Sequence, residues 1–379
     1  MKNKITWIKW GAGLALPLAL VGLFELLKGD QARMGWWVDH VMAPVEQFLA
    51  RMGWWVDHVM APVEQFLARI WSIFPAFSVA EVLTALALIF GVVWLIRAVV
   101  LLIRKREGRI FAKRLLAMLG AVLWIWCAMD WMWNAAYYAP SFAQRSGLET
   151  QPYSVETLEQ VTALFAEKAA EYSTQVQRDE NGLFAEDTAA IFEKGPEIYE
   201  NLTQEFPCLE LKHPTRAKPI FFSRLQSILG FTGVYFPFTG EANVNVDAPS
   251  CLLPATIAHE MAHQRMVAAE QEANFVGIAA SVTSGDPVYV YSGYLMGLIQ
   301  LCNALYPVDP EGWSAIVEQY FTPELAADWN DNNAYWAELS SPVEDAAEQV
   351  YDSFLKGNDQ KLGMRSYGAC VDLLVTYFS

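Results

Sequence analysis

The amino-acid sequence predicts a mainly α-helical protein with a small β-hairpin or sheet, in which three N-terminal transmembrane helices precede an extracytoplasmic domain. Three long apolar stretches lie before residue 140, and soluble amphipathic patterns follow it. The charge also divides there, because residues 1–139 hold 14 Lys and Arg against 9 Asp and Glu, whereas residues 140–379 hold 12 against 33. Such an acidic domain lacks the basic surface that nucleic acids require, so we expect no nucleic-acid partner.

The transmembrane helices are assigned from apolar length and positive charge. Ile5–Leu27, Val79–Ile103 and Leu115–Ala136 are each long enough to cross a bilayer, which takes about 20 apolar residues in a helix. No small-residue cleavage site follows the first stretch, so we interpret it as a retained anchor. Basic residues gather at the N-terminus and again between the second and third stretches. Because such residues mark the cytoplasmic side, the C-terminal domain is expected outside the cytoplasm of a bacterial cell, on a multi-pass membrane protein.

These assignments divide the chain into four expected segments. Residues 1–30 form the first transmembrane helix with a cytoplasmic N-terminus, and residues 31–77 form a duplicated amphipathic interfacial segment. Residues 78–139 form the second and third transmembrane helices with a basic cytoplasmic loop, and residues 140–379 form the extracytoplasmic domain.

The interfacial segment contains an identical 18-residue repeat, ARMGWWVDHVMAPVEQFL, at 32–49 and again at 50–67. Eighteen residues make about five whole helical turns, so a second copy continues the apolar face of the first. In a helix that begins at Pro44, the apolar side chains share one side, and Glu46 and Asp57 lie on the other. We expect an amphipathic helix that lies on the outer membrane surface or on the extracytoplasmic domain.

The extracytoplasmic domain begins with two expected helices, Thr157–Gln175 and Thr188–Gln204. The pattern then changes to strand between about Pro219 and Asp247. The runs VYFPF and ANVNV, separated by Thr-Gly-Glu at 239–241, predict a β-hairpin. Beyond residue 250 the chain is again mainly helical.

An HExxH pattern follows the hairpin directly, at 259–263. His259 and His263 are four residues apart on a helix and share one face, so both can bind one Zn2+ ion. Glu260 then lies beside the metal, where its carboxylate can accept a proton from a zinc-bound water.

A zinc site with an open catalytic position needs a third protein ligand. On a straight helix Glu270 would lie about 10 Å along the axis from His263, so the helix must break between Gln264 and Ala269. The sequence RMVAA offers no obvious helix breaker there. Two candidates for the third ligand remain open, Glu270, which we favour, and Glu272. Asn274, four residues after Glu270, can orient a ligand histidine by a hydrogen bond.

A family resemblance rests on several of these motifs. The EQEAN stretch resembles the glutamate motif ExxA[DN] of gluzincin metallopeptidases, and a wider set resembles an uncharacterised bacterial domain-of-unknown-function family of membrane-anchored HExxH proteins. That resemblance implies a zincin-like α+β domain and a zinc-dependent hydrolase with this membrane topology. Met266 departs from the family pattern, which has a helix-breaking glycine after HQR, and the 18-residue duplication is an addition. The wider set comprises WMWNAAYYAP at 131–140, YFPFTGEANVN at 235–245, AHEMAHQR at 258–265, EQEANF at 270–275, YSGYL at 291–295 and SFLKGNDQKLGMRSYGACVDLLVTYF at 353–378.

Together these features predict a membrane-anchored zinc metallopeptidase that hydrolyses peptide bonds outside the cytoplasm, with Glu260 as the general base. Its expected partners are the lipid bilayer and a peptide or protein substrate, which could pair with an exposed edge of the ANVNV strand. Tyr291, Tyr294 and Tyr367 are candidates to stabilise the oxyanion. Two alternatives stay open: a membrane-anchored scaffold or binding protein with a structural or degenerate zinc site, and a zinc amidase that acts on cell-wall material.

Overall fold

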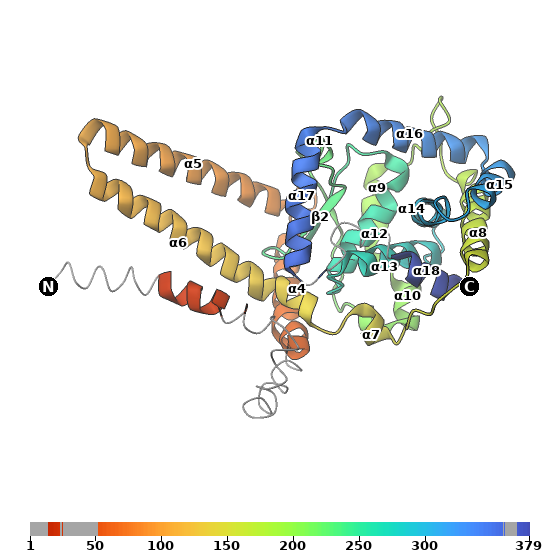
Figure 1. Cartoon of the computed structure of the whole chain (residues 1–379), viewed down its shortest axis with the longest axis horizontal. Helices are drawn as coiled ribbons and strands as arrows, with labels where there is room; N and C mark the ends of the chain where they lie inside the picture. The colour runs from red at the N-terminus through yellow and green to blue at the C-terminus, as the bar shows by residue number, and fades with distance from the viewer. Residues whose placement is uncertain (1–13, 23–24, 26–51, 359, 361–369) are drawn as a thin grey trace. The chain divides into compact units, whose positions relative to one another are not determined.

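The computed structural model describes residues 14–22, 25, 52–358, 360 and 370–379 (Figure 1). Most of the first expected span, the first repeat copy and Tyr367 lie outside these residues. The described chain is mainly α-helical with one three-stranded sheet, as the sequence predicts. It divides into two compact units: unit 1 consists of residues 1–62 and 79–139, and unit 2 of residues 63–78 and 140–379.

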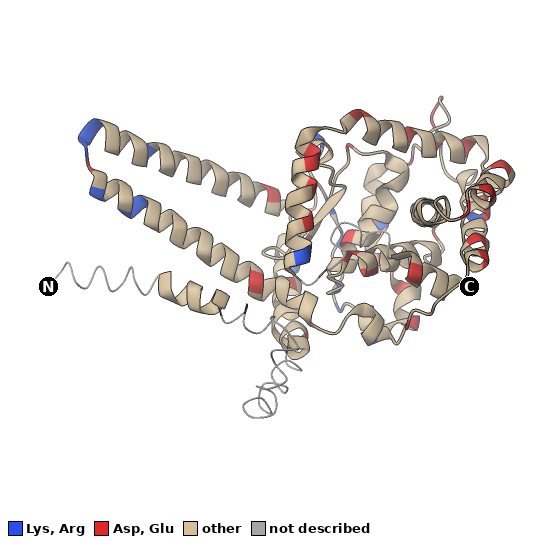
Figure 2. Cartoon of the chain, in the orientation of Figure 1, with Lys and Arg blue, Asp and Glu red and all other residues tan. Residues whose placement is uncertain are grey.

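Unit 1 contains two long helices, α5 (Val79–Lys105) and α6 (Gly108–Met132), followed by a short 3-10 helix, η2 (Asn134–Tyr138). Both α5 and the α6–η2 segment are long and apolar enough to cross a membrane, which agrees with the second and third predicted spans. Arg114 of α6 lies over the ring of Trp94 on α5, at 4.9 Å from the ring centroid. Basic residues gather where α5 passes into α6 (Figure 2).

Unit 2 contains most of the remaining helices, and local capping explains where several of them begin. α14 to α17 each start with a proline at the first position, directly after an Asp, Thr or Ser whose side chain accepts a backbone N–H. Proline fits this position because its missing N–H would have no partner within the helix. The helices are α4 (Ala61–Trp71, of which residues 63–71 belong to unit 2), α7 (Phe142–Ser146), α8 (Val155–Ser173), α9 (Thr188–Lys194), α10 (Glu200–Glu205), α11 (Ser223–Ile228), α12 (Leu253–His263), α13 (Glu270–Thr283), α14 (Pro287–Leu305), α15 (Pro310–Tyr320), α16 (Pro323–Leu339), α17 (Pro342–Gly357) and α18 (Cys370–Phe378).

The first helix predicted for this domain is confirmed as α8, whereas the second is interrupted. Between α9 and α10 the chain forms a 3-10 turn at Gly195–Glu197. Pro196 has no N–H to donate to an α-helical hydrogen bond, and Gly195 packs closely against Met261 and Ile257 of α12. The prediction of one helix over 188–204 is therefore wrong.

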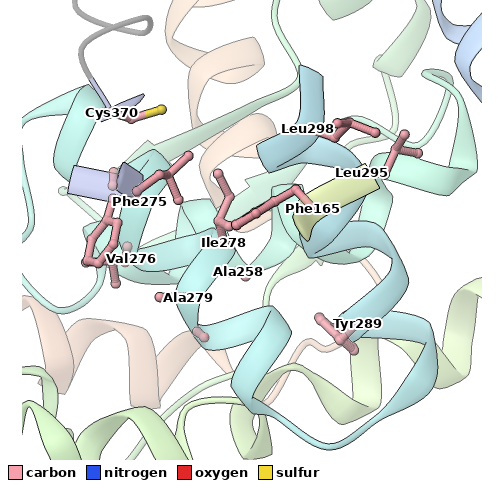
Figure 3. Close-up of a cluster of buried hydrophobic side chains, with 14 of the residues drawn as sticks. Phe165, Ala258, Phe275, Val276, Ile278, Ala279, Tyr289, Leu295, Leu298 and Cys370 are labelled. Carbon is pink, nitrogen blue, oxygen red and sulfur yellow. The ribbon is translucent and has the colours of Figure 1, made fainter. Parts of the chain in front are cut away.

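The core of unit 2 lies between α8, α12, α13 and α14 (Figure 3). α14 meets the same length and composition criteria as a membrane span, but 61% of its most apolar window is buried inside the protein, as expected for a core helix. α13 approaches α12 very closely at Gly277, where a Cβ would lie 2.7 Å from the backbone nitrogen of His259. The candidate site is thus built on two buried helices that approach each other closely.

The sheet contains β1 (Lys218–Pro219), β2 (Gly233–Phe236) and β3 (Glu241–Val244) in the order β1-β3-β2. β2 and β3 form the predicted antiparallel hairpin, and β1 pairs with β3 in parallel. The ANVNV run was expected to offer an exposed edge, and this expectation is wrong. β3 is paired on both sides and all four of its residues are buried, so β2 is the edge strand on the hairpin side.

The second repeat copy corrects the predicted amphipathic face. Glu64, the copy of Glu46, was expected on the solvated side, yet it is buried and its Oε2 accepts a hydrogen bond from Tyr235 Oη at 2.5 Å. Val63 and Phe66, assigned by the repeat to the apolar side, are exposed. α4 therefore contacts the sheet through its polar face, because the sheet supplies a hydrogen-bond donor for the carboxyl group.

Candidate metal centre

The HExxH residues lie on α12, and every residue of this helix is buried. α12 begins with Pro254 in its first turn and ends at His263. The following turn, not another helical turn, carries the chain toward α13. The break predicted between Gln264 and Ala269 is present, because α13 begins at Glu270.

Met266 makes this turn possible. Its φ of 59° lies in the left-handed region that glycine prefers, so Met266 adopts a conformation that is unusual for a residue with a side chain. The Val267 N–H donates to Ala262 O at 3.3 Å, and Arg145 donates to the Met266 carbonyl at 3.1 Å. For a non-glycine residue the left-handed conformation costs about 1–2 kcal/mol, which these contacts and the burial of Met266 oppose.

The turn brings Glu270 back to the two histidines. Glu270 Oε2 lies 3.4 Å from His259 Nε2 and 3.7 Å from His263 Nε2. One ligand atom from each residue lies within 4.8 Å of the other two, as binding of one metal ion requires, and all three side chains are buried. Two imidazoles and one carboxylate are the donor set of a three-ligand catalytic zinc site, so the residues present fit zinc.

Hydrogen bonds orient the ligand atoms toward a common point. His263 Nδ1 lies 2.7 Å from Val267 O, which fixes the ring so that Nε2 faces Glu270. Asn274 is buried on α13, but neither its Nδ2 nor His259 Nδ1 has a hydrogen-bond partner among the described residues, so its role in orienting a ligand stays a prediction. A histidine held by a backbone carbonyl through its second ring nitrogen is a common arrangement around protein-bound metals.

Burial and mutual charge set the ionisation of the cluster. Burial lowers the pKa of His263 to about 4, so this ring is neutral at pH 7, as a metal ligand must be. Burial opposes ionisation of Glu270, but His263, His259 and Tyr351 together lower its pKa to about 2. Burial raises the pKa of Glu260 to about 8.

Glu272, the other candidate for the third ligand, is occupied elsewhere. Its two carboxylate oxygens accept the backbone N–H groups of Phe142 and Ala143 at 2.7 and 3.0 Å, at the beginning of α7. The structure therefore places Glu270 with the histidines and Glu272 against the segment that follows unit 1 in the chain. Geometry favours Glu270 as the third ligand.

Tyr291 and Tyr294, which were predicted as candidates to stabilise the oxyanion, make other contacts in the structure. The Tyr291 hydroxyl donates to Asp328, and Arg178 lies over the same ring at 5.5 Å. Tyr294 packs edge-on against Phe165 with ring centroids 5.1 Å apart. Both rings thus take part in core contacts of unit 2, which do not support an oxyanion role.

Two residues beside the candidate centre were not predicted from the sequence. Tyr351 on α17 donates a hydrogen bond from its hydroxyl to Glu270 Oε1 at 2.6 Å, across 81 residues of sequence. Gly233 of β2 lies directly against the Glu260 carboxylate, and a Cβ at this position would overlap it. No local pattern marks either residue, because only the tertiary fold brings α17 and β2 to the cluster.

The fold and this site define a class: a mainly helical protein with long apolar helices and a buried HExxH helix that faces a glutamate. The chain belongs to the family described as "Protein of unknown function (DUF3810)", whose model matches residues 56–375. This match includes α5, α6 and the whole candidate centre. No curated protein and no solved structure gives a significant match to the chain.

Proposed function

We propose that the protein is a membrane-anchored zinc metallopeptidase that hydrolyses peptide bonds outside the cytoplasm. The observation that carries the proposal is the convergence of His259, His263 and Glu270 on one buried point, with Glu260 next to the first histidine. A bound zinc ion supplies a Lewis acid that polarises a carbonyl group and lowers the pKa of a coordinated water.

The protein residues then have distinct tasks. His259 and His263 would offer ring nitrogens to the ion, and Glu270 would offer a carboxylate whose position Tyr351 fixes. A pKa of about 8 leaves Glu260 mostly protonated at pH 7 in the metal-free site, and a cation bound nearby would favour the ionised form. In that form the carboxylate would take a proton from the attacking water and deliver it to the leaving amine. Gly233 keeps the β2 backbone close to that carboxylate, so β2 is the strand beside which an extended substrate would lie.

Metal analysis of the full-length protein tests the site. We expect about one zinc per chain in the wild type, loss of zinc in Glu270→Gln, and full zinc content in Glu272→Gln, which makes the same chemical change two residues away. Circular dichroism checks that both variants fold. A wild-type protein that takes up no zinc, or loss of zinc in Glu272→Gln alone, would overturn the ligand assignment.

Hydrolysis of a peptide library by the same preparations tests the activity. Glu260→Gln should keep its zinc and lose about 10²–10⁴-fold in turnover, because a general acid–base contributes that much to rate. Equal hydrolysis by Glu260→Gln and the wild type would instead indicate that a zinc-based peptidase is the wrong assignment for this site.

A further inference from the structure

One face of α4 holds this helix on unit 2. Glu64 accepts the Tyr235 hydroxyl, and the Lys218 ammonium donates to the carbonyl of Trp71 at the end of α4, at 2.7 Å. The hairpin turn lies against the same face, since a Cβ at Gly240 would overlap the backbone of Glu64. Glu64 is only 1% exposed, and burial raises its pKa well above the usual range.

The opposite face of α4 is apolar and exposed. Val63, Phe66 and Ile70 lie within about 60° of one another at 100° per residue, and the arc is centred about 150° from that of Glu64 and Ala68. Phe66 is 63% exposed. The exposed apolar surface continues past the helix through three more residues, Ile73, Phe74 and Phe77, of which Ile73 is 69% exposed.

This surface ends where the chain enters a candidate membrane span. Phe77 precedes α5 by two residues, and the eight-residue step from Trp71 to Val79 can extend over at most about 28 Å. Large apolar side chains that are exposed together in one short segment indicate an interaction surface. The adjoining span limits how far the surface can lie from lipid, and an amphipathic helix beside a bilayer buries its apolar side in the interface.

The exposed side chains of this segment carry little charge, so binding to a membrane would depend on burial of its apolar side chains. Arg69 is the one charged residue among the exposed side chains from 62 to 77, all of which the structure describes. Attraction to anionic headgroups is worth only about 1 kcal/mol per basic residue near the surface. The occupant that fits is therefore the acyl-chain boundary of the bilayer, whatever its headgroup charge.

We infer that residues 63–77 form a membrane-docking face, which holds unit 2 against the lipid surface by the exposed side of α4. The inference does not depend on the proposed peptidase activity. It does have a consequence for the candidate metal centre, because the ring of Tyr235 lies 6.3 Å from that of His263, between the centre and α4. The docking face thus supports the centre from the side of the membrane.

Photocrosslinking in lipid nanodiscs tests this inference on the full-length protein. Benzoylphenylalanine replaces Phe66 in one variant and Tyr306 in a matched control. Tyr306 is 54% exposed and lies in the link between α14 and α15, and the α15 label is on the opposite side of unit 2 from the α4 label (Figure 1). After irradiation, mass spectrometry should find at least about tenfold more lipid adduct at residue 66, in phosphatidylcholine and in phosphatidylglycerol nanodiscs alike.

Other adducts would overturn the inference. Crosslinks from residue 66 to α5, α6 or a second copy of the chain, without lipid adducts, would show that protein covers this face. Equal lipid labelling at residues 66 and 306 would show that α4 has no preferred contact with the bilayer. A second variant with benzoylphenylalanine at Ile73, outside the helix, repeats the test where the change does not touch α4 packing.

Discussion

Single residues around the candidate centre divide into those that local spacing reveals and those that it hides. His259, Glu260 and His263 are set by one helical turn, so sequence spacing predicts their arrangement. Glu270 reaches the histidines only because the chain turns before α13, and no residue type in the sequence marks this turn. Tyr351 reaches Glu270 from a helix 81 residues further along the chain. Long-range contacts of this kind depend on packing, which leaves no periodic signal in the chain.

Tyr351 allows a residue-scale prediction. Tyr351→Phe removes the hydrogen bond to Glu270 and keeps the ring that packs against Phe231, so the fold should be unchanged. Loss of such an outer contact typically weakens metal binding about 10–100-fold, and we expect a weakening within that range for zinc. Competition with a chelating dye measures it. Tyr335→Phe, which removes a hydroxyl bonded to Asp247, should bind zinc like the wild type. Equal affinity in Tyr351→Phe would contradict the prediction.

At the scale of elements, the predictions failed where neighbours decide the outcome. The β-hairpin was predicted from its turn. The prediction that β3 has an exposed edge was wrong, because β1 pairs with that edge and, with only two residues, is too short to be recognised in the sequence. The interfacial helix was predicted from its periodicity, but its buried face was not, since the hydrogen bond from the Tyr235 hydroxyl to the buried Glu64 carboxyl group depends on the tertiary fold. Periodicity shows that a helix has two faces and does not show which one packs.

The turn between α12 and α13 gives an element-scale prediction. Met266→Gly and Met266→Ala both remove a buried side chain, but only glycine adopts a φ of 59° without strain. The glycine variant should therefore be more stable than the alanine variant by about 1 kcal/mol, by chemical denaturation. Ala190 in α9 is an exposed helical control at which Ala190→Gly should destabilise by a similar amount. A more stable alanine variant at position 266 would show that the turn stores no such strain.

At the scale of the whole molecule, the order of segments restricts the topology. Unit 2 is assembled from residues 63–78 and 140–379, so in the proposed membrane protein the chain between them would have to leave and return on the same side of the membrane. Two candidate spans, α5 and α6, would satisfy this requirement, whereas one or three would not. The charge division at residue 140, visible in the sequence alone, follows the same boundary: the basic turn between α5 and α6 lies at one end of both helices, and the acidic unit continues from the other (Figure 2).

This topology predicts the orientation of the chain. The basic turn contains Arg104, Lys105 and Arg106, and positive charge holds such a turn in the cytoplasm. Alkaline phosphatase, which needs disulfides formed outside the cytoplasm, should be at least about tenfold more active when fused after Ser379 than after Glu107 in a bacterial host. Green fluorescent protein fused at the same two positions should give the reverse order. Phosphatase activity at both positions would exclude a pair of antiparallel membrane spans formed by α5 and α6. Higher phosphatase activity after Glu107 than after Ser379 would place unit 2 in the cytoplasm.

If charge sets the orientation, replacing the three basic residues with asparagine should reduce the difference between the two fusions, because the turn then loses its preference for the cytoplasmic side.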